Sequence, residues 1–186
     1  DLKAGLAHDE SGLNVLLVFA PADLTYGALT AYTAVAAASL AREVEQAGDD
    51  ALGPTLYDLL VSHKRDTGEL ADVEVLTDFQ LQIEHALDLQ GRERVLFIDA
   101  SVSVPQPCEL RSLQAEQDTS YTTHAMSPAA ILAVYAKIND EPPPPAFLLS
   151  IRGYEFELGE ELSAKACANL QLACAQACDF LNNPAI

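Results

Sequence analysis

The chain of 186 residues has a formal net charge of −18, with 49% hydrophobic and 20% charged residues. This length fits one domain with its own core, and the composition is that of a globular protein rather than a disordered one. Nucleic acids and anionic membranes bind surfaces rich in Lys and Arg, so the acidic charge argues against both as partners. We therefore expect a single domain over residues 1–186 whose partner presents a neutral or basic protein surface.

Hydropathy along the chain does not favour a membrane or secreted protein. No apolar run approaches the ~20 residues that span a bilayer. The segment 1–14 also lacks a basic stretch followed by an apolar one, as a secretory signal would have. The sequence therefore predicts a cytoplasmic protein.

The first half of the chain predicts an alternation of strands and helices. Leu13–Ala20 is a short apolar run typical of a strand that is buried on both faces, and the alanine-rich segment Leu29–Gln46 predicts a helix. Residues 48–71 contain Gly, Pro and scattered charges around apolar Leu56–Val61, which predicts a loop-rich insertion with one short helix.

The middle of the chain continues this alternation. Val73–Leu76 predicts a strand, Asp78–Leu89 an amphipathic helix and Arg94–Ile98 another buried strand. After Asp99 two prolines favour a loop, with an edge strand near Leu110–Leu113.

Two serines mark the starts of the last two helices. Ser127 is a good N-cap and is followed by Pro128, which suits the first helical position, and Ser163 is a plausible cap later in the chain. The elements expected here are a helix over 128–139, a stiff proline connector over 142–145, a strand over Ala146–Ile151 and a helix over Ala164–Leu181.

Strands that alternate with helices predict an α/β fold. We expect a three-layer sandwich with a mostly parallel, twisted sheet of about five strands, helices on both faces, and a core over about 13–182. Ligands of such sheets bind beyond the carboxyl ends of the strands. This rule selects the loop 21–27, Asp99, and the loop after Ile151, and we expect these three places to converge.

Asp99 and His124 are the candidate site residues. Asp99 follows a buried strand, and His124 lies in a loop just before a predicted helix. Taken separately, an aspartate here can simply cap a turn, and a single loop histidine is usually exposed. Together they fit either a general acid/base pair or two ligands of a divalent metal such as zinc or nickel, with a third group supplied by the protein or the substrate.

Other kinds of site have less support. The first loop has Gly27 alone rather than a glycine-rich phosphate cradle, so no nucleotide or other organic cofactor is expected. The four cysteines lack zinc-site spacings, and Cys108 has no local signature of a nucleophile. Cys167, Cys174 and Cys178 fall on one face of the last helix, and we interpret them as small apolar residues. A redox or metal role would require that these thiols are accessible and titrate readily.

The order of three motifs resembles the [NiFe]-hydrogenase maturation protease family. VLFIDAS is followed by TTHAMSP at a helix start and then by a strand that leads into IRGYEFELGEELS. The resemblance implies that Asp99 and His124 bind nickel, which is carried by the immature hydrogenase large subunit. It further implies an endopeptidase that removes a C-terminal peptide from this precursor. A monomer is the default expectation for an acidic, single-domain protein of this kind.

The first loop departs from the family pattern. The family has two acidic residues before a glycine, and the second acid is the third nickel ligand. The equivalent stretch here reads APADLTYGAL, which places Thr25 and Tyr26 at those positions. A neutral phenol is a poor ligand for a divalent cation, and Asp23 is the nearby acid that would replace it. The alternative is a non-catalytic relative that binds a hydrogenase or similar metalloprotein as an assembly factor.

Overall fold

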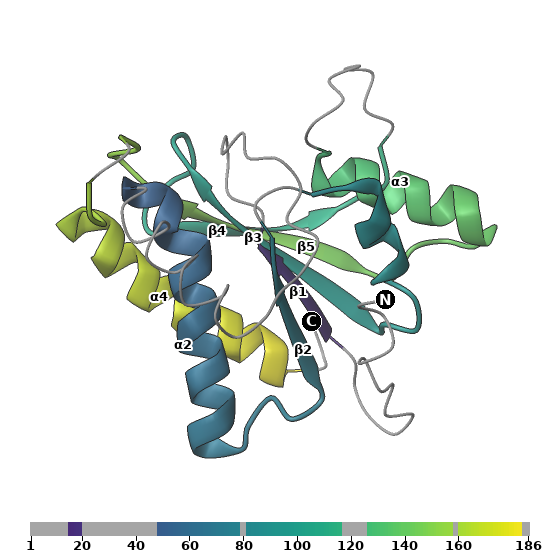
Figure 1. The fold of residues 1–186 in the computed structure, drawn as a ribbon, viewed down its shortest axis with the longest axis horizontal. Helices are drawn as coiled ribbons and strands as arrows, with labels where there is room; N and C mark the ends of the chain where they lie inside the picture. Colours follow the sequence, from purple (N-terminus) through teal and green to yellow (C-terminus); the bar gives the residue numbers. More distant parts are fainter. Residues whose placement is uncertain (1–14, 20–47, 79–80, 117–125, 158–159, 184–186) are drawn as a thin grey trace.

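The computed structural model describes residues 15–19, 48–78, 81–116, 126–157 and 160–183 (Figure 1). Within them the strands are β1 (Val15–Phe19), β2 (Val73–Thr77), β3 (Arg94–Ser101), β4 (Cys108–Leu113) and β5 (Ala146–Arg152). The helices are α2 (Leu52–Thr67), α3 (Pro128–Asn139) and α4 (Ala164–Asn182), with short 3₁₀ turns η2 (Gly48–Ala51) and η3 (Ile83–Leu87). The helix predicted over Leu29–Gln46 lies outside the described residues.

These strands form one mixed sheet in the order β2-β1-β3-β5-β4. The first four are parallel to their neighbours, and β4 runs antiparallel to β5 at one edge. The α/β class predicted from the sequence is confirmed, and the predicted edge strand near Leu110–Leu113 is present as β4. Because four strands are parallel, their carboxyl ends open on one common edge of the sheet.

Both faces of the central strand β3 are buried, which explains its continuous apolar sequence. Leu96, Ile98 and Ala100 pack into a cluster with α2 and α4 on one face. Val95 and Phe97 pack into a second cluster with α3 and η3 on the other face. Figure 1 shows α2 and α4 lying together, away from α3.

The interpretation of 48–71 as a loop-rich insertion is wrong. The segment forms the 16-residue helix α2, whose Leu52, Leu56 and Leu60 are fully buried in the main core. These leucines recur every four residues and therefore lie on one side of a helix. The helix is thus part of the core.

The Gly and Pro residues that suggested a loop are compatible with α2. Pro54 lies in the first turn, where its missing N–H is not needed by the helix. Gly68 ends the helix in a left-handed conformation with φ of 75°, and its N–H donates to the Lys64 carbonyl. Their positions therefore delimit the helix instead of interrupting it.

The helix predicted over Asp78–Leu89 is also wrong. Where this segment is described it contains the short turn η3. Of the apolar residues that would form the buried face of the predicted helix, Ala86 is buried, but Ile83 and Leu87 are 57% and 41% exposed. Leu81 and Leu89 are buried in their place. Leu81 is five residues before Ala86, and Ala86 is three residues before Leu89. The buried apolar residues of this segment therefore differ from those on the apolar face of the predicted helix.

The starts of α3 and α4 are confirmed. The Ser127 hydroxyl accepts from the Ala130 N–H at 3.1 Å, and the Ser163 hydroxyl accepts from the Ala166 N–H at 3.2 Å. Each serine satisfies a helix N–H that has no carbonyl partner within the helix. None of the described helices is long and apolar enough to cross a membrane.

A buried carboxylate connects the start of α2 to the segment that follows β5. Asp49 is fully buried, and its oxygens accept hydrogen bonds from the N–H groups of Tyr154, Glu155 and Ser163 at 2.6, 2.9 and 2.8 Å. The Ser163 hydroxyl adds a fourth at 2.9 Å. The carboxylate therefore fixes the connection between β5 and α4.

We expect Asp49→Ala to reduce the free energy of unfolding by at least about 3 kcal/mol. Hydrogen bonds to a charged group are each worth about 1.5–3 kcal/mol, and the substitution leaves buried donors without an acceptor. Urea unfolding measures the change. Asp179→Asn, on the exposed side of α4, is the matched control and should change stability by less than about 0.5 kcal/mol. Equal stability of the two variants would contradict this role of Asp49.

Candidate functional site

Asp99 lies within β3, beside the carboxyl edge of the sheet. The strand continues to Ser101, so the predicted strand end at Ile98 is three residues too early. Asp99 is in register with Ser150 of β5, while β1 ends at Phe19, opposite Ile98. Asp99 therefore lies two residues before the last registered pair with β5, near the carboxyl edge and in the middle of the sheet.

Alternation along β3 places the half-buried Asp99 side chain on the same face as Val95 and Phe97. The start of α3 approaches this face. Met126 packs against the cluster that contains Phe97, and its N–H donates to the Leu81 carbonyl at 2.9 Å. His124, two residues before Met126, lies outside the described residues.

Asp23, Thr25 and Tyr26 in the first loop likewise lie outside the described residues. The predicted convergence of this loop with Asp99 therefore stays a prediction. Among the side chains that are described, no group of three or more His, Cys, Asp or Glu is arranged to hold a metal ion.

A second acidic residue, Asp78, follows β2 at the same edge, where the sequence predicts the start of a helix. Thr77, Phe19 and Ile98 are in register, so Asp78 and Asp99 lie at the same level, two strands apart. Strand spacing puts their Cα atoms roughly 10 Å from each other. Asp99 directly follows the apolar Ile98, whereas Asp78 follows Thr77, so the signal that the two acids share is only their place near the end of a predicted strand.

His85 binds Asp78. The His85 Nε2 lies 3.3 Å from the Asp78 Oδ2, and Nδ1 lies 3.1 Å from the Gln82 carbonyl oxygen, to which it donates when the ring is protonated. Burial lowers the pKa of His85, but the hydrogen bond and charge of Asp78 outweigh burial, so the pKa is raised above 6.5. Because both ring nitrogens are engaged, His85 is suited to orient Asp78 rather than to bind a metal.

Cationic side chains gather where β5 ends. The guanidinium carbon of Arg152 and the Nζ of Lys165 lie 5.5 and 5.3 Å from the centre of the Tyr154 ring. Arg152 pairs with Ser101, two residues beyond Asp99 on the same face of β3. Arg152 and Lys165 therefore bring positive charge to the end of β5 in a chain whose net charge is −18.

Cys108 is not a good nucleophile. Burial raises the pKa of its thiol, and the thiol donates to the Gln176 side chain at 3.1 Å. A raised pKa disfavours the reactive thiolate at neutral pH. This agrees with the absence of a nucleophile motif around Cys108.

Comparison by sequence finds no match, either to a family model or to a curated protein. Comparison of folds does find matches. The [NiFe] hydrogenase maturation protease HycI from Thermococcus kodakarensis has a TM-score of 0.60 at 13% identity, over 92% of this chain and 94% of that one. The chain has the fold of the [NiFe]-hydrogenase maturation proteases.

Two further maturation proteases match at similar levels. The hydrogenase-maturating endopeptidase HybD from E. coli has a TM-score of 0.56 at 16% identity, over 90% of this chain and 91% of that one. The hydrogenase 2 maturation peptidase from a Thaumarchaeota archaeon has a TM-score of 0.55 at 20% identity, over 90% and 97%. The family resemblance predicted from three motifs is thus confirmed as a likeness of fold, which spans nearly the whole chain.

The His85–Asp78 pair should make stability depend on pH. A folded-state pKa above the unfolded value adds stability that is complete below about pH 6.5 and is lost as pH rises through the raised pKa. We therefore expect the stability advantage of the wild type over His85→Gln to shrink between about pH 6 and 8. Urea unfolding at a series of pH values tests this.

Asp78→Asn is the matched variant, because it removes the charge that raises the pKa of His85 while it leaves the imidazole in place. It should flatten the same pH dependence. If the difference in unfolding free energy between the wild type and His85→Gln stays constant or grows as pH rises, Asp78 does not hold His85 in its charged form.

Proposed function

We propose that this chain is a [NiFe]-hydrogenase maturation endopeptidase that recognises a nickel-loaded large-subunit precursor and removes its C-terminal peptide. One observation carries the proposal. Asp99 lies at the carboxyl edge of the central strand, in a fold shared over about 90% of the chain with proteins named as maturation proteases. Ligands of parallel α/β sheets bind at this edge.

The residues proposed to meet the nickel of the precursor are Asp99, His124 and Asp23. Carboxylate oxygens and an imidazole nitrogen suit a divalent first-row metal. Nickel is here part of the substrate. Asp99 and His124 also act as the catalytic pair, and the reaction adds water across the scissile amide to give a carboxylic acid and an amine.

Charge is consistent with a protein substrate. The net charge of −18 favours a neutral or basic partner surface over a nucleic acid or an anionic membrane. Arg152 lies at the same edge, in register with Ser101 two residues beyond Asp99, and would attract a carboxylate at the end of a peptide. We propose a cytoplasmic monomer.

The replacement of the family's acids by Thr25 and Tyr26 favours a second candidate function. Without a third acidic ligand, the chain would bind the precursor or a similar metalloprotein as an assembly factor and would not cut it. The two functions share the Asp99 edge and differ only in whether the bound precursor is shortened.

We expect the purified chain to shorten a nickel-loaded large-subunit precursor, and Asp99→Asn to reduce the rate at least about 100-fold, as is typical for loss of a positioned catalytic or ligand group. Gel mobility and mass spectrometry of the precursor measure the cut. Asp72→Asn is the matched control, because Asp72 is exposed and precedes β2 at the opposite edge of the sheet. Loss of cleavage in both variants would argue against a site at Asp99.

Tyr26→Glu separates the two candidates. If the chain is an endopeptidase with a weakened ligand set, a carboxylate at this position should increase the rate of cleavage, because it is a better ligand for a divalent cation than a phenol. Stable complex formation by the wild type and by Tyr26→Glu, with no cut in either, would favour the assembly factor.

A further inference from the structure

Two cationic side chains share one aromatic ring just beyond the end of β5. The guanidinium of Arg152 and the ammonium of Lys165 lie over the Tyr154 ring, 5.5 and 5.3 Å from its centre. Arg152 is the last residue of β5 and Lys165 lies in the first turn of α4, so two elements converge on this tyrosine. Cations are attracted to the face of an aromatic ring within about 6 Å. We call these three side chains the cation–ring group.

Asn169 fixes the direction of one hydrogen bond at the Tyr154 hydroxyl. The Asn169 Nδ2 donates to the Arg152 carbonyl at 2.8 Å and to the Tyr154 hydroxyl at 3.2 Å. A backbone carbonyl can only accept, so the nitrogen of this amide has to face it. The hydroxyl oxygen is therefore the acceptor in its own bond with Asn169, which is buried.

The Tyr154 hydroxyl keeps its hydrogen for a further acceptor. The side-chain nitrogen of Gln106 donates to the same oxygen. A phenol has room for about two incoming donors and one hydrogen of its own to donate. Because two amides donate to the oxygen, the hydrogen is directed to another acceptor. The cation–ring group thus offers a hydroxyl donor beside two positive charges, a donor set that suits an anion.

The two cations also retain donors for a ligand. One guanidinium nitrogen of Arg152 donates to the Val104 carbonyl at 3.3 Å, which uses one of the five N–H groups of an arginine. Lys165 is exposed. Glu155 and Glu157, exposed in the same connection, offset part of the positive charge, so an anion has to make direct hydrogen bonds in order to bind here.

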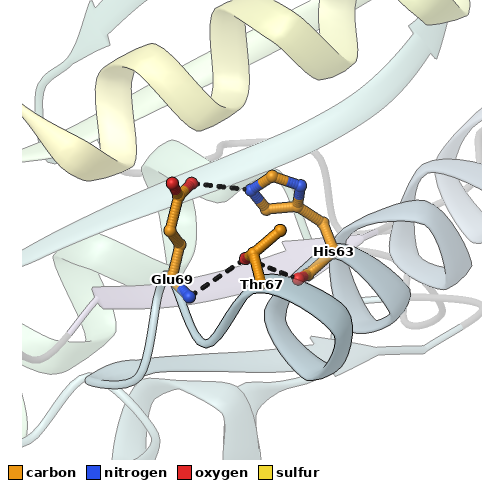
Figure 2. A network of polar contacts seen from close by, with 3 residues as sticks. All are labelled: His63, Thr67 and Glu69. Atoms are coloured by element: carbon orange, nitrogen blue, oxygen red, sulfur yellow. Dashed lines mark hydrogen bonds and ion pairs between the residues drawn. The ribbon is translucent and has the colours of Figure 1, made fainter.

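The cations at the end of α2 are arranged differently. The His63 Nε2 lies 2.8 Å from the Glu69 Oε2, and the Thr67 hydroxyl accepts from the Glu69 N–H at 3.0 Å, as Figure 2 shows. The Arg65 Nε donates to the Asp66 carboxylate at 2.9 Å. Each of these cationic side chains meets an acid of the chain itself, whereas the cation–ring group places two like charges on one ring. In a chain with 28 acidic residues, such a local conflict is typical of a functional site.

The cation–ring group begins at the edge of the sheet that carries Asp99. Arg152 is in register with Ser101, two residues beyond Asp99. The spacing of strands and the rise per residue put the Cα atoms of Arg152 and Asp99 roughly 8 Å apart. An extended peptide covers this distance with about two or three residues.

We propose that Arg152, Lys165 and the Tyr154 hydroxyl bind a carboxylate of the peptide substrate, about two or three residues from the amide that is cut. The choice of a peptide as ligand rests on the proposed peptidase function. A peptide offers two sources of this group, its terminal carboxylate and the side chains of Asp and Glu. Because the rest of the chain is strongly acidic, a carboxylate held here would fix the register of the peptide beside Asp99.

The first test is an NMR titration of the full-length chain with small carboxylates. The probes are N-acetylglycine for a terminal carboxylate, N-acetylaspartate α-amide for a side-chain carboxylate, and N-acetylglycinamide as the neutral control. We expect the carboxylates to shift the resonances of Arg152 and Tyr154, and the tighter of the two identifies the source. Arg152→Gln and Tyr154→Phe should each weaken binding about 10-fold, as for a hydrogen bond to a charged group.

Lys165→Gln should weaken the same binding by less, about 2- to 5-fold, because the lysine is exposed. Arg65→Gln is the matched control, since Arg65 is exposed at the end of α2, and it should leave binding unchanged. Thermal unfolding of each variant checks that it folds. Equal shifts with the neutral amide, or equal loss of binding in Arg65→Gln and Arg152→Gln, would overturn the proposal.

The second test is the kinetics of precursor cleavage. Arg152→Gln should raise KM about 10-fold and change kcat by less than about twofold, because a group that binds substrate and transition state alike affects KM alone. A fall in kcat with unchanged KM would contradict the proposed role. If the wild type does not cut the precursor, the peptidase function fails while binding of the probes still stands. If the probes do not bind but cleavage depends on Asp99, only the carboxylate site fails.

Discussion

The buried carboxylate of Asp49 determines how the two halves of the chain meet. It has four donors, all between Tyr154 and Ser163, more than one hundred residues later in the sequence. A desolvated charge is tolerated only when hydrogen bonds compensate it, so these groups have to come together for the chain to fold. The contact fixes the positions at which α2 and α4 begin, because Asp49 lies just before α2 and Ser163 just before α4. These two helices cover one face of the sheet.

Close packing around Asp49 extends this constraint to the backbone. Gly48, with φ of 59°, approaches the Glu155 carbonyl so closely that a Cβ atom would lie 2.6 Å from its oxygen. Gly153, just after β5, would place a Cβ 2.5 Å from the Phe156 ring. Both glycines allow the chain to run beside the carboxylate, and both lie next to the edge that carries Asp99.

The central strand β3 joins this core to the site. Its two faces contribute to two separate apolar clusters, and near the carboxyl edge Asp99 and Ser101 are half-buried while Ala100 between them stays in the core. Asp99 is therefore held on a rigid element while its carboxylate remains half-buried. A site built on a strand end is positioned more accurately than one on a loop, which would suit the proposed recognition of a metal-loaded precursor.

Local signals in the sequence were enough to predict the alternation of strands and helices, the buried strand before Asp99 and the capping serines of α3 and α4. Each depends on residues within a few positions of one another. The sequence did not reveal the role of α2, the extent of η3, the buried Asp49 or the contact of His85 with Asp78. Which apolar residues of α2 and η3 are buried depends on which side of each element packs against the sheet. The donors to Asp49 lie more than one hundred residues later in the chain. The tertiary structure decided these features, because hydrogen bonding and desolvation act between groups that only folding brings together.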